Sequence, residues 1–227
     1  MNFPIETPEW SDLSPSLGKI IREIVAGAGA QSNPFLLHTA GIPGAGKSSL
    51  ADSLEKSLAD LFPVRVAFDK IMCAIPEYSA EPDSLLAFSK YELPARAAGY
   101  LLVKNLMEKR ANIIFDHSAS FPKHVDLLKF AKSLGYKVAF VRIVAAPETV
   151  KKRILARQAV EGRHTPLNYV DERLVIIEKL LEDYKAVSDV YFEIQNDDRP
   201  LVNRMAFFQD ASERIAKGVR DLVAKPS

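Results

Sequence analysis

Residues 34–54, PFLLHTAGIPGAGKSSLADSL, place a short apolar run directly before a glycine cluster and then a helical pattern of leucines. Within this stretch, residues 41–48 (GIPGAGKS) fit the phosphate-loop pattern of two glycines with four positions between them, followed by Lys-Ser. Glycine allows backbone conformations that a side chain would block, so successive amides can turn inward and hold phosphate oxygens at the start of a helix. The sequence therefore predicts a nucleotide site formed by Gly41, Ile42, Pro43, Gly44, Ala45, Gly46, Lys47, Ser48 and Ser49.

The loop also indicates roles within that nucleotide site. Lys47 is expected to reach the terminal phosphates of ATP or GTP, and the Ser48 hydroxyl is expected to ligate Mg2+. A GTPase would need a guanine-reading Asn-Lys-x-Asp segment, and the chain has none, because the QNDD of residues 195–198 lacks the lysine. A motor or AAA-type ATPase would carry an acidic pair after its metal-binding strand, where this chain offers Asp116 alone. The pattern favours a small-molecule kinase.

Around the loop, short β-rich runs alternate with long amphipathic segments. The runs are FLLHTA (35–40), VRVAFD (64–69), NIIFDH (112–117), KVAFVRIVA (137–145) and VYFEIQ (190–195). Nearly continuous apolar strands that alternate with helices are typical of a parallel sheet covered on both faces. We therefore predict an α/β fold, a three-layer sandwich of the P-loop NTPase kinase type with a central five-stranded, mainly parallel sheet.

Length and composition bound the class of protein. A chain of 227 residues suits a single P-loop kinase domain, in which we expect an N-terminal helical extension over 1–33, a lid over 147–168 and a C-terminal helix over 205–227. The net charge of +1 gives no global attraction to nucleic acid or membrane. A single cysteine, Cys73, excludes an internal disulfide and is expected to be a small buried hydrophobic residue. The N-terminus does not resemble a signal peptide, so the expected location is cytoplasmic.

Polar residues gather where the predicted strands end. Ligands of such sheets bind beyond the carboxyl ends of the strands. Asp69 ends the second run, 22 positions after Lys47, where a carboxylate can take the proton of an attacking hydroxyl; the alternative role is to cap the following helix. Asp116 ends the third run and is a candidate for magnesium binding or for contact with the substrate. His117 beside it is a substrate-contact candidate, or a structural hydrogen-bonding residue.

The basic stretch VKKRILARQAVEGRHTP (150–166) is the candidate lid. Arg157 and Arg163 suit a lid that neutralises charge on a phosphoryl group during transfer. Arg153 has equal claims to that role and to a solvated helix face. The following Asp-Glu-Arg of residues 171–173 is expected to cap or pair along the next helix.

The segment between the second and third runs is long for one crossover. Its excess length suggests an acceptor pocket, with Tyr78, Glu92 and Arg96 as hydrogen-bonding candidates. Glu92 stands just before Pro94, so stabilising a helix start there is its alternative role.

Four ordered pieces together resemble the zeta toxin family of P-loop kinases: GIPGAGKSS, FDKIMCAIPEY, LGYKVAFVRIVAAPETV and RQAVEGRHTP. Known members of that family phosphorylate a hydroxyl of UDP-N-acetylglucosamine or a related activated sugar. The resemblance implies a catalytic aspartate at Asp69, lid arginines at Arg163 and Arg157, and an antitoxin protein as a possible partner. Where the family has Glu-Gly-Thr after the third strand, this chain has DHSAS (116–120), which points to a changed acceptor pocket.

The leading hypothesis is a Mg2+-dependent phosphotransferase that moves the γ-phosphate of ATP or GTP to a hydroxyl of a small molecule. Lys47, Asp69, Arg157 and Arg163 are its catalytic candidates, Glu92, Asp116 and His117 its substrate contacts, and Ser48 and Asp116 its metal ligands. Two alternatives stay open, a kinase of a nucleoside, cofactor or polyol, and a nucleotide-gated interaction module without phosphotransfer.

Overall fold

The computed structural model describes residues 2–161, 165–197 and 201–225. Its centre is a five-stranded sheet in the order β2-β3-β1-β4-β5, and every neighbouring pair of strands is parallel. The strands are β1 (Phe35–Ala40), β2 (Val64–Val66), β3 (Ile113–Phe115), β4 (Lys137–Val144) and β5 (Val190–Gln195). The predicted five-stranded α/β sandwich is confirmed, and the sheet is wholly parallel.

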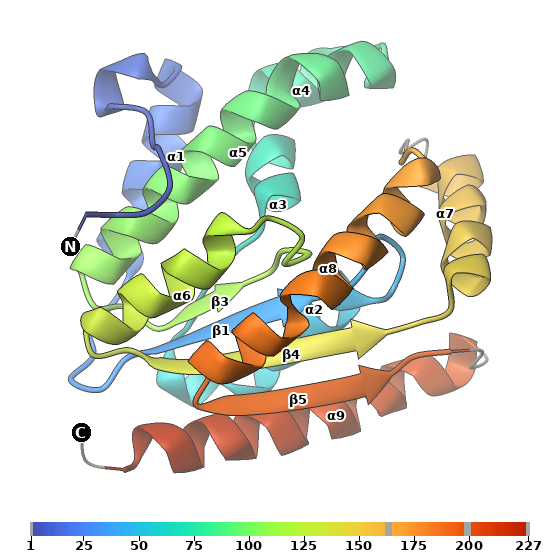
Figure 1. Cartoon of the computed structure of the whole chain (residues 1–227). Coiled ribbons are helices and arrows are strands. Elements are labelled where there is room, and N and C mark those ends of the chain that lie inside the picture. Colours follow the sequence, from blue (N-terminus) through green and yellow to red (C-terminus); the bar gives the residue numbers. More distant parts are fainter. Residues whose placement is uncertain (1, 162–164, 198–200, 226–227) are drawn as a thin grey trace.

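Helices cover both faces of the sheet (Figure 1). They are α1 (Pro15–Gly27), α2 (Lys47–Ser57), α3 (Phe68–Cys73), α4 (Pro76–Ala80), α5 (Ser84–Glu108), α6 (Lys123–Ser133), α7 (Pro147–Glu161), α8 (Asn168–Val187) and α9 (Leu201–Val223), with short 3-10 turns at Trp10–Asp12 and Ala59–Leu61. Two apolar cores result. One packs α1, α5 and α6 on the sheet, and the other packs α2, α7 and α9 on the opposite face.

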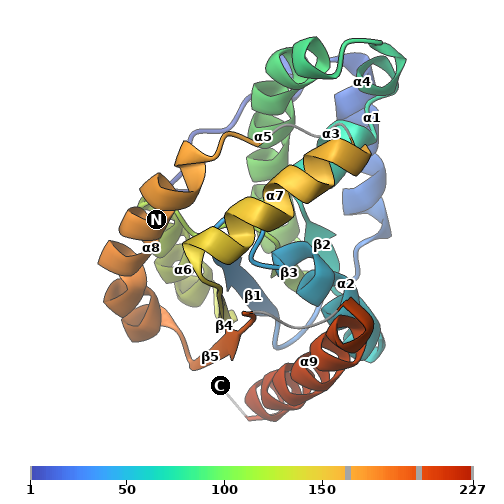
Figure 2. The ribbon, with the colours of Figure 1, turned by 90° about the vertical axis from the view of Figure 1, so that its right-hand side faces the viewer.

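Strand β1 shows why the sheet is buried on both sides. All six of its residues are buried; Leu36 belongs to one core and Leu37 to the other, as the alternation of side chains along a strand requires. Parallel strands of this kind need cover on both faces. The carboxyl ends of the strands therefore share one open edge, which Figure 2 views with α7 lying across it.

Local signals explain several helix boundaries. Helix α1 begins where the Ser14 hydroxyl accepts a hydrogen bond from the Leu17 amide at 3.3 Å, with Pro15 in the first helical position. Helix α6 is followed by Gly135 at φ +81°, a left-handed conformation that ends helices and favours glycine.

Four expectations about boundaries and burial need correction. Strand β2 stops at Val66, so Asp69 lies in the first turn of α3 and not at a strand end. Pro94 lies inside the 25-residue helix α5, so no helix starts beside Glu92; the proline is exposed there, where the lost helical hydrogen bond is least costly. The C-terminal helix begins at Leu201, four residues earlier than expected. Cys73, for which burial is the usual state, is exposed.

Among the described residues, no helix is both long and apolar enough to cross a membrane.

Candidate active site

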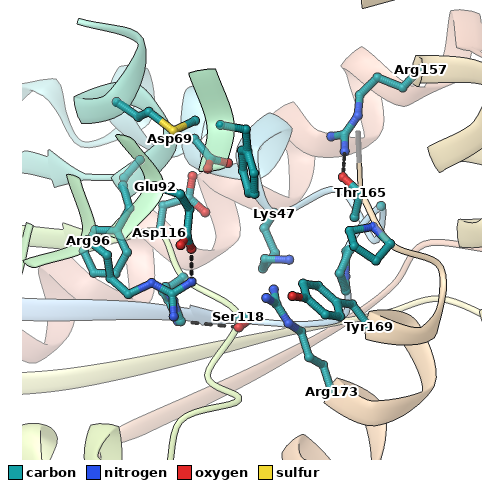
Figure 3. A pocket seen from close by; sticks show the side chains of 18 of the residues that line it. Lys47, Asp69, Glu92, Arg96, Asp116, Ser118, Arg157, Thr165, Tyr169 and Arg173 are labelled. Atoms are coloured by element: carbon teal, nitrogen blue, oxygen red, sulfur yellow. Dashed lines mark hydrogen bonds and ion pairs between the residues drawn. The ribbon is translucent and has the colours of Figure 1, made fainter. Parts of the chain in front are cut away.

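A cavity of about 400 Å³ opens at the carboxyl edge of the sheet, between the phosphate loop, α3, α5, α7 and α8. Its charged lining residues are Lys47, Asp69, Glu92, Arg96, Asp116, Arg157 and Arg173. Figure 3 shows Asp69, Glu92 and Asp116 on one side of Lys47, with Arg157 and Thr165 on the other. Acids and cations thus converge from distant parts of the chain on one space.

The phosphate loop has the backbone that its glycines predict. Gly41 and Gly46 lie at φ +147° and +107°, and a Cβ at Gly46 would come within 2.7 Å of both Asn196 Nδ2 and Phe208 Cζ. Of the nine predicted loop residues, Pro43, Gly44 and Lys47 line the cavity. Ser48 lies in the first turn of α2, and Ser49 next to it is exposed.

The Lys47 side chain folds over the phosphate loop and is hydrogen-bonded to its backbone. Its Nζ donates to the carbonyl oxygens of Gly41 at 2.8 Å and Ile42 at 3.0 Å. Burial lowers the pKa of Lys47 to about 8, against the opposing effect of Asp116. A phosphate bound at the loop would place negative charge beside this amine and so stabilise its charged form.

Arg153 binds the back of the loop. Its guanidinium donates to the backbone oxygens of Asn196 at 3.0 Å and Asp197 at 3.2 Å, and to that of Gly44 at 3.5 Å. Asn196 Nδ2 donates to the Ala45 carbonyl at 2.6 Å. Arg153 therefore ties α7 to the loop and is not among the residues that line the cavity. This structural role differs from both expected alternatives, a lid residue and a solvated helix face.

Asp69 keeps its predicted place despite the shorter strand. It is exposed, lines the cavity and faces the Lys47 side of it (Figure 3). The first turn of α3 brings it there, because β2 ends at the same edge of the sheet and α3 follows after one residue. A carboxylate in this position can accept the proton of a hydroxyl group.

Asp116 is more strongly engaged than the sequence suggested. Its Oδ2 pairs with Arg65 NH2 at 2.6 Å, and its Oδ1 lies 3.4 Å from the Thr39 hydroxyl. The side chains of Asp116 and Arg65 are 4% and 2% exposed. Arg65 also pairs with Asp52 and Glu55 and donates to the Ser48 carbonyl at 3.3 Å. Arg65 thus links the end of the third strand to helix α2, a role that the sequence did not predict.

His117 follows β3 and borders two cavities. Besides the first one, it lines a second cavity of about 660 Å³. Its ring stacks on Phe115 with an interplanar angle of 17°. Burial, followed by the nearby His38, Arg96 and Arg173, lowers the pKa of His117 below its usual value, so the ring is neutral at neutral pH.

Arg96 and Arg173 stand where the two cavities meet. Both line both cavities, together with Leu93, His117 and Tyr169. Arg96 pairs with Glu92 one helical turn earlier. Arg173 lies over the Tyr169 ring at 4.8 Å, and burial with the nearby Arg96 lowers its pKa.

Arg173 pairs along α8 with Tyr169, as predicted for residues 171–173, and it also lines both cavities, which the sequence did not indicate. Asp171 pairs instead with Lys151 of the preceding helix, α7, at 3.1 Å. The helical period places Arg173 four positions after Tyr169 on one face of α8, and this spacing was the available signal.

Arg157 donates to the Thr165 hydroxyl at 3.1 Å and lines the first cavity from α7. Its role in a lid stays a prediction. Arg163 lies outside the described residues, as does part of the predicted 147–168 lid.

The oxygen atoms that the protein offers suit a magnesium ion held mainly by the phosphates of the bound nucleotide. Mg2+ prefers octahedral oxygen donors and commonly uses one or two carboxylates, water and substrate phosphates. The Ser48 hydroxyl and the Asp116 carboxylate supply such oxygens beside the loop. Within the described parts of the chain, no group of three or more His, Cys, Asp or Glu residues could hold a metal alone.

The sequence model of the zeta toxin family matches residues 21–203. The chain belongs to the zeta toxin family. This match covers every cavity-lining element except the N-terminal segment, whose Ile5 and Glu6 line the second cavity. A search of curated proteins gave no match.

Solved structures share the fold of this zeta toxin family chain at low sequence identity. A chain of the PezAT chromosomal toxin–antitoxin system of Streptococcus pneumoniae superposes with a TM-score of 0.63 at 16% identity, covering 97% of this chain and 100% of its own. Shikimate kinase from Acinetobacter baumannii, solved in complex with shikimate, gives a TM-score of 0.52 at 13% identity over 85% of this chain and 96% of its own. The fold is that of P-loop kinases.

Proposed function

We propose that this protein transfers the γ-phosphate of ATP or GTP to a hydroxyl group of a small molecule. The observation that carries the proposal is the convergence of the phosphate-loop Lys47 and the exposed carboxylate of Asp69 on one cavity at the sheet edge. A nucleotide-binding loop alone would not require a carboxylate facing its lysine. A kinase requires both, one for the donor and one for the acceptor.

The reaction is a direct transfer. The Asp69 carboxylate takes the proton of the acceptor hydroxyl, and the oxygen of that hydroxyl forms a bond to the γ-phosphorus. The bond between the γ-phosphorus and the oxygen that bridges it to the β-phosphate breaks, which releases the nucleoside diphosphate. Lys47 and Arg157, with Arg163 by family resemblance, bear the charge of the phosphoryl group in flight. Glu92 and His117 contact the acceptor. Mg2+, when bound near Ser48 and Asp116, would neutralise phosphate charge.

The acceptor that the site favours is larger than a simple polyol. The first cavity holds the reacting group, and the second, about 660 Å³ in volume, adjoins it through shared lining residues. The shared lining carries Arg96 and Arg173, which suit an acceptor with an anionic portion. A UDP-N-acetyl sugar, the substrate class of the family, has both a reacting sugar and a charged remainder.

The direct test is phosphotransfer from γ-labelled ATP with Mg2+, first to UDP-N-acetylglucosamine and then to a panel of metabolites. We expect Asp69→Asn to reduce transfer by about a hundredfold or more, the range of general-base catalysis, while leaving ATP affinity unchanged. Asp126→Asn is the matched control, because Asp126 is an exposed acid in the first turn of another helix, α6. Full transfer by Asp69→Asn would overturn the mechanism. ATP turnover that no acceptor stimulates would favour a nucleotide-gated interaction module instead.

An antitoxin protein is the partner that we propose, because the PezAT neighbour comes from a toxin–antitoxin system. We place the protein in the cytoplasm, where nucleotide donors are available. Growth arrest on expression that is lost with Lys47→Ala would support toxicity through phosphotransfer. Growth arrest retained by Lys47→Ala would contradict it.

A further inference from the structure

We propose that Asn196 is a positioning residue of the phosphate loop, which fixes the Ala45–Gly46 peptide group so that the Gly46 amide faces a bound phosphate. The inference deepens the proposed function and rests on its nucleotide half, since it concerns the phosphate donor and not the acceptor. Asn196 follows β5 directly and is 2% exposed. It belongs to the QNDD stretch of residues 195–198, which has no part in the mechanism described above.

One short hydrogen bond joins Asn196 to the loop. Its Nδ2 donates to the Ala45 carbonyl oxygen at 2.6 Å, and both residues are buried. A carbonyl oxygen can only accept, so the amide nitrogen of Asn196, and not the amide oxygen, faces it. The same Nδ2 would lie 2.7 Å from a Cβ at Gly46. The side chain of Asn196 thus rests directly against the Ala45–Gly46 peptide group.

That hydrogen bond sets the direction of the Gly46 amide. The Ala45–Gly46 peptide is trans, and in a trans peptide group the carbonyl and the following N–H point in opposite directions. Because Asn196 holds the Ala45 carbonyl on its own side, the Gly46 N–H points away from Asn196. No acceptor among the described residues meets this N–H, and unpaired loop amides of this kind bind phosphate oxygens. Asn196 therefore aims a donor at the ligand without touching it.

The main chain around Asn196 is fixed at three points. Its N–H donates to the Val144 carbonyl at 2.7 Å, and its own carbonyl accepts from Arg153 at 3.0 Å. The carboxylate of the next residue, Asp197, accepts from the Ala146 amide at 2.7 Å. These partners belong to the end of β4, to α7 and to the turn between them. A side chain on a backbone fixed in this way holds the loop in one position relative to the sheet and α7.

A second buried asparagine shows how a purely structural amide is bonded. Asn112, 3% exposed, uses both ends of its side chain: Oδ1 accepts from the Phe35 amide at 2.9 Å, and Nδ2 donates to the Leu61 carbonyl at 2.7 Å. Among the described residues, by contrast, no donor forms a hydrogen bond with Asn196 Oδ1. A buried amide with an unpaired oxygen costs stability, so stability alone does not account for Asn196, whereas its hydrogen bond to the loop does.

Binding of Mg-ATP to the full chain tests this role. Asn196→Leu keeps the size of the side chain and removes the donor, and we expect the dissociation constant for Mg-ATP to rise about tenfold, the effect of one lost hydrogen bond. Asn112→Leu is the matched control, because it removes a buried hydrogen bond to a backbone carbonyl at the amino ends of the strands; it should leave that constant unchanged. Equal constants for the two variants would overturn the proposal. If Asn196→Leu does not fold, Asn196→Ala and Asn112→Ala take the place of this pair in both experiments.

An NMR titration with inorganic pyrophosphate separates the aiming of the amide from a general effect on stability. In the wild type we expect the Gly46 amide proton to move downfield as pyrophosphate binds, because it gains a charge-assisted hydrogen bond. The shift at saturation should be smaller in Asn196→Leu and should keep its wild-type size in Asn112→Leu. The same shift in all three proteins would overturn the proposal.

Neither experiment contains an acceptor, which separates this inference from the proposed function. A chain that binds Mg-ATP but phosphorylates no acceptor would overturn the proposed phosphotransfer, and the two titrations would still decide the role of Asn196.

Discussion

Lys47 shows how one side chain can be prepared for a ligand that carries charge. Its ammonium group is satisfied by two loop carbonyls in the free protein, and burial holds its pKa at about 8. Phosphate oxygens would stabilise the charged amine, so the pKa rises in the complex. Nucleotide binding must therefore take up protons at a pH above about 8.

This proton uptake is measurable by titration calorimetry of Mg-ATP binding at pH 8.5 in two buffers with different ionisation enthalpies. We expect a net uptake by the wild type and a weakening of affinity as the pH rises through 8 and beyond, by at most about tenfold per pH unit. Lys47→Met is the control, which should show no uptake by this group. Identical proton balances in the two proteins would contradict the assignment.

Arg65 leads to a second prediction, about stability. Replacing it with Met leaves the Asp116 carboxylate buried without its partner, and the expected loss is about 3–5 kcal/mol in the free energy of unfolding. Arg220→Met removes an exposed pair with Asp60 and should cost about 1 kcal/mol or less. Chemical denaturation measures both values. Addition of Asp116→Asn should recover part of the Arg65→Met loss, and a lack of recovery would show that Arg65 does not act through Asp116.

At the scale of helices and strands, the sequence predicted some elements of the fold correctly and others not. The phosphate loop, the five strands and the helix around α6 were predictable, because glycine spacing, apolar runs and leucine periodicity are local signals. Helix α5 was not, because Pro94 locally favours a helix start while the packing of the whole 25-residue helix decides otherwise. Arg65 was missed because its partner Asp116 is distant in sequence, and only the sheet topology brings the two together. Arg173 was missed because its spacing from Tyr169 indicates a shared helix face but not the cavity that this face borders.

The loop element carries a prediction of its own. Gly46→Ala would place a methyl group within 2.7 Å of Asn196 Nδ2 and Phe208 Cζ at a φ of +107°, so the loop must shift away from α9. We expect nucleotide binding to be lost and the free energy of unfolding to fall by about 1–3 kcal/mol. Gly27→Ala, which meets nothing within 4 Å at the end of α1, should leave binding unchanged. Fluorescent-nucleotide titration and thermal melting compare them. Normal binding by Gly46→Ala would show that the loop tolerates the displacement.

At the scale of the whole molecule, the N-terminal segment joins the site from outside the region that matches the family model. Ile5 is buried and, with Glu6, lines the second cavity, and Phe3 packs edge-on against Phe130 at 5.7 Å. The family match begins only at residue 21. The segment is therefore in a position to tune the acceptor without affecting the nucleotide.

Deleting residues 1–8 should raise the KM for UDP-N-acetylglucosamine by about tenfold, since a wall of the cavity is lost, and leave the KM for ATP unchanged. The melting temperature should fall by a few degrees, because Ile5 loses its buried contacts. Ile5→Ala is the smaller matched change and should give a weaker effect in the same direction. The two KM values distinguish a role in the second cavity from a role in stability alone. If the segment only stabilises the fold, its deletion lowers activity through unfolding and leaves the KM values for the acceptor and for ATP unchanged. If it shapes the second cavity, its deletion raises the KM for the acceptor and not the KM for ATP.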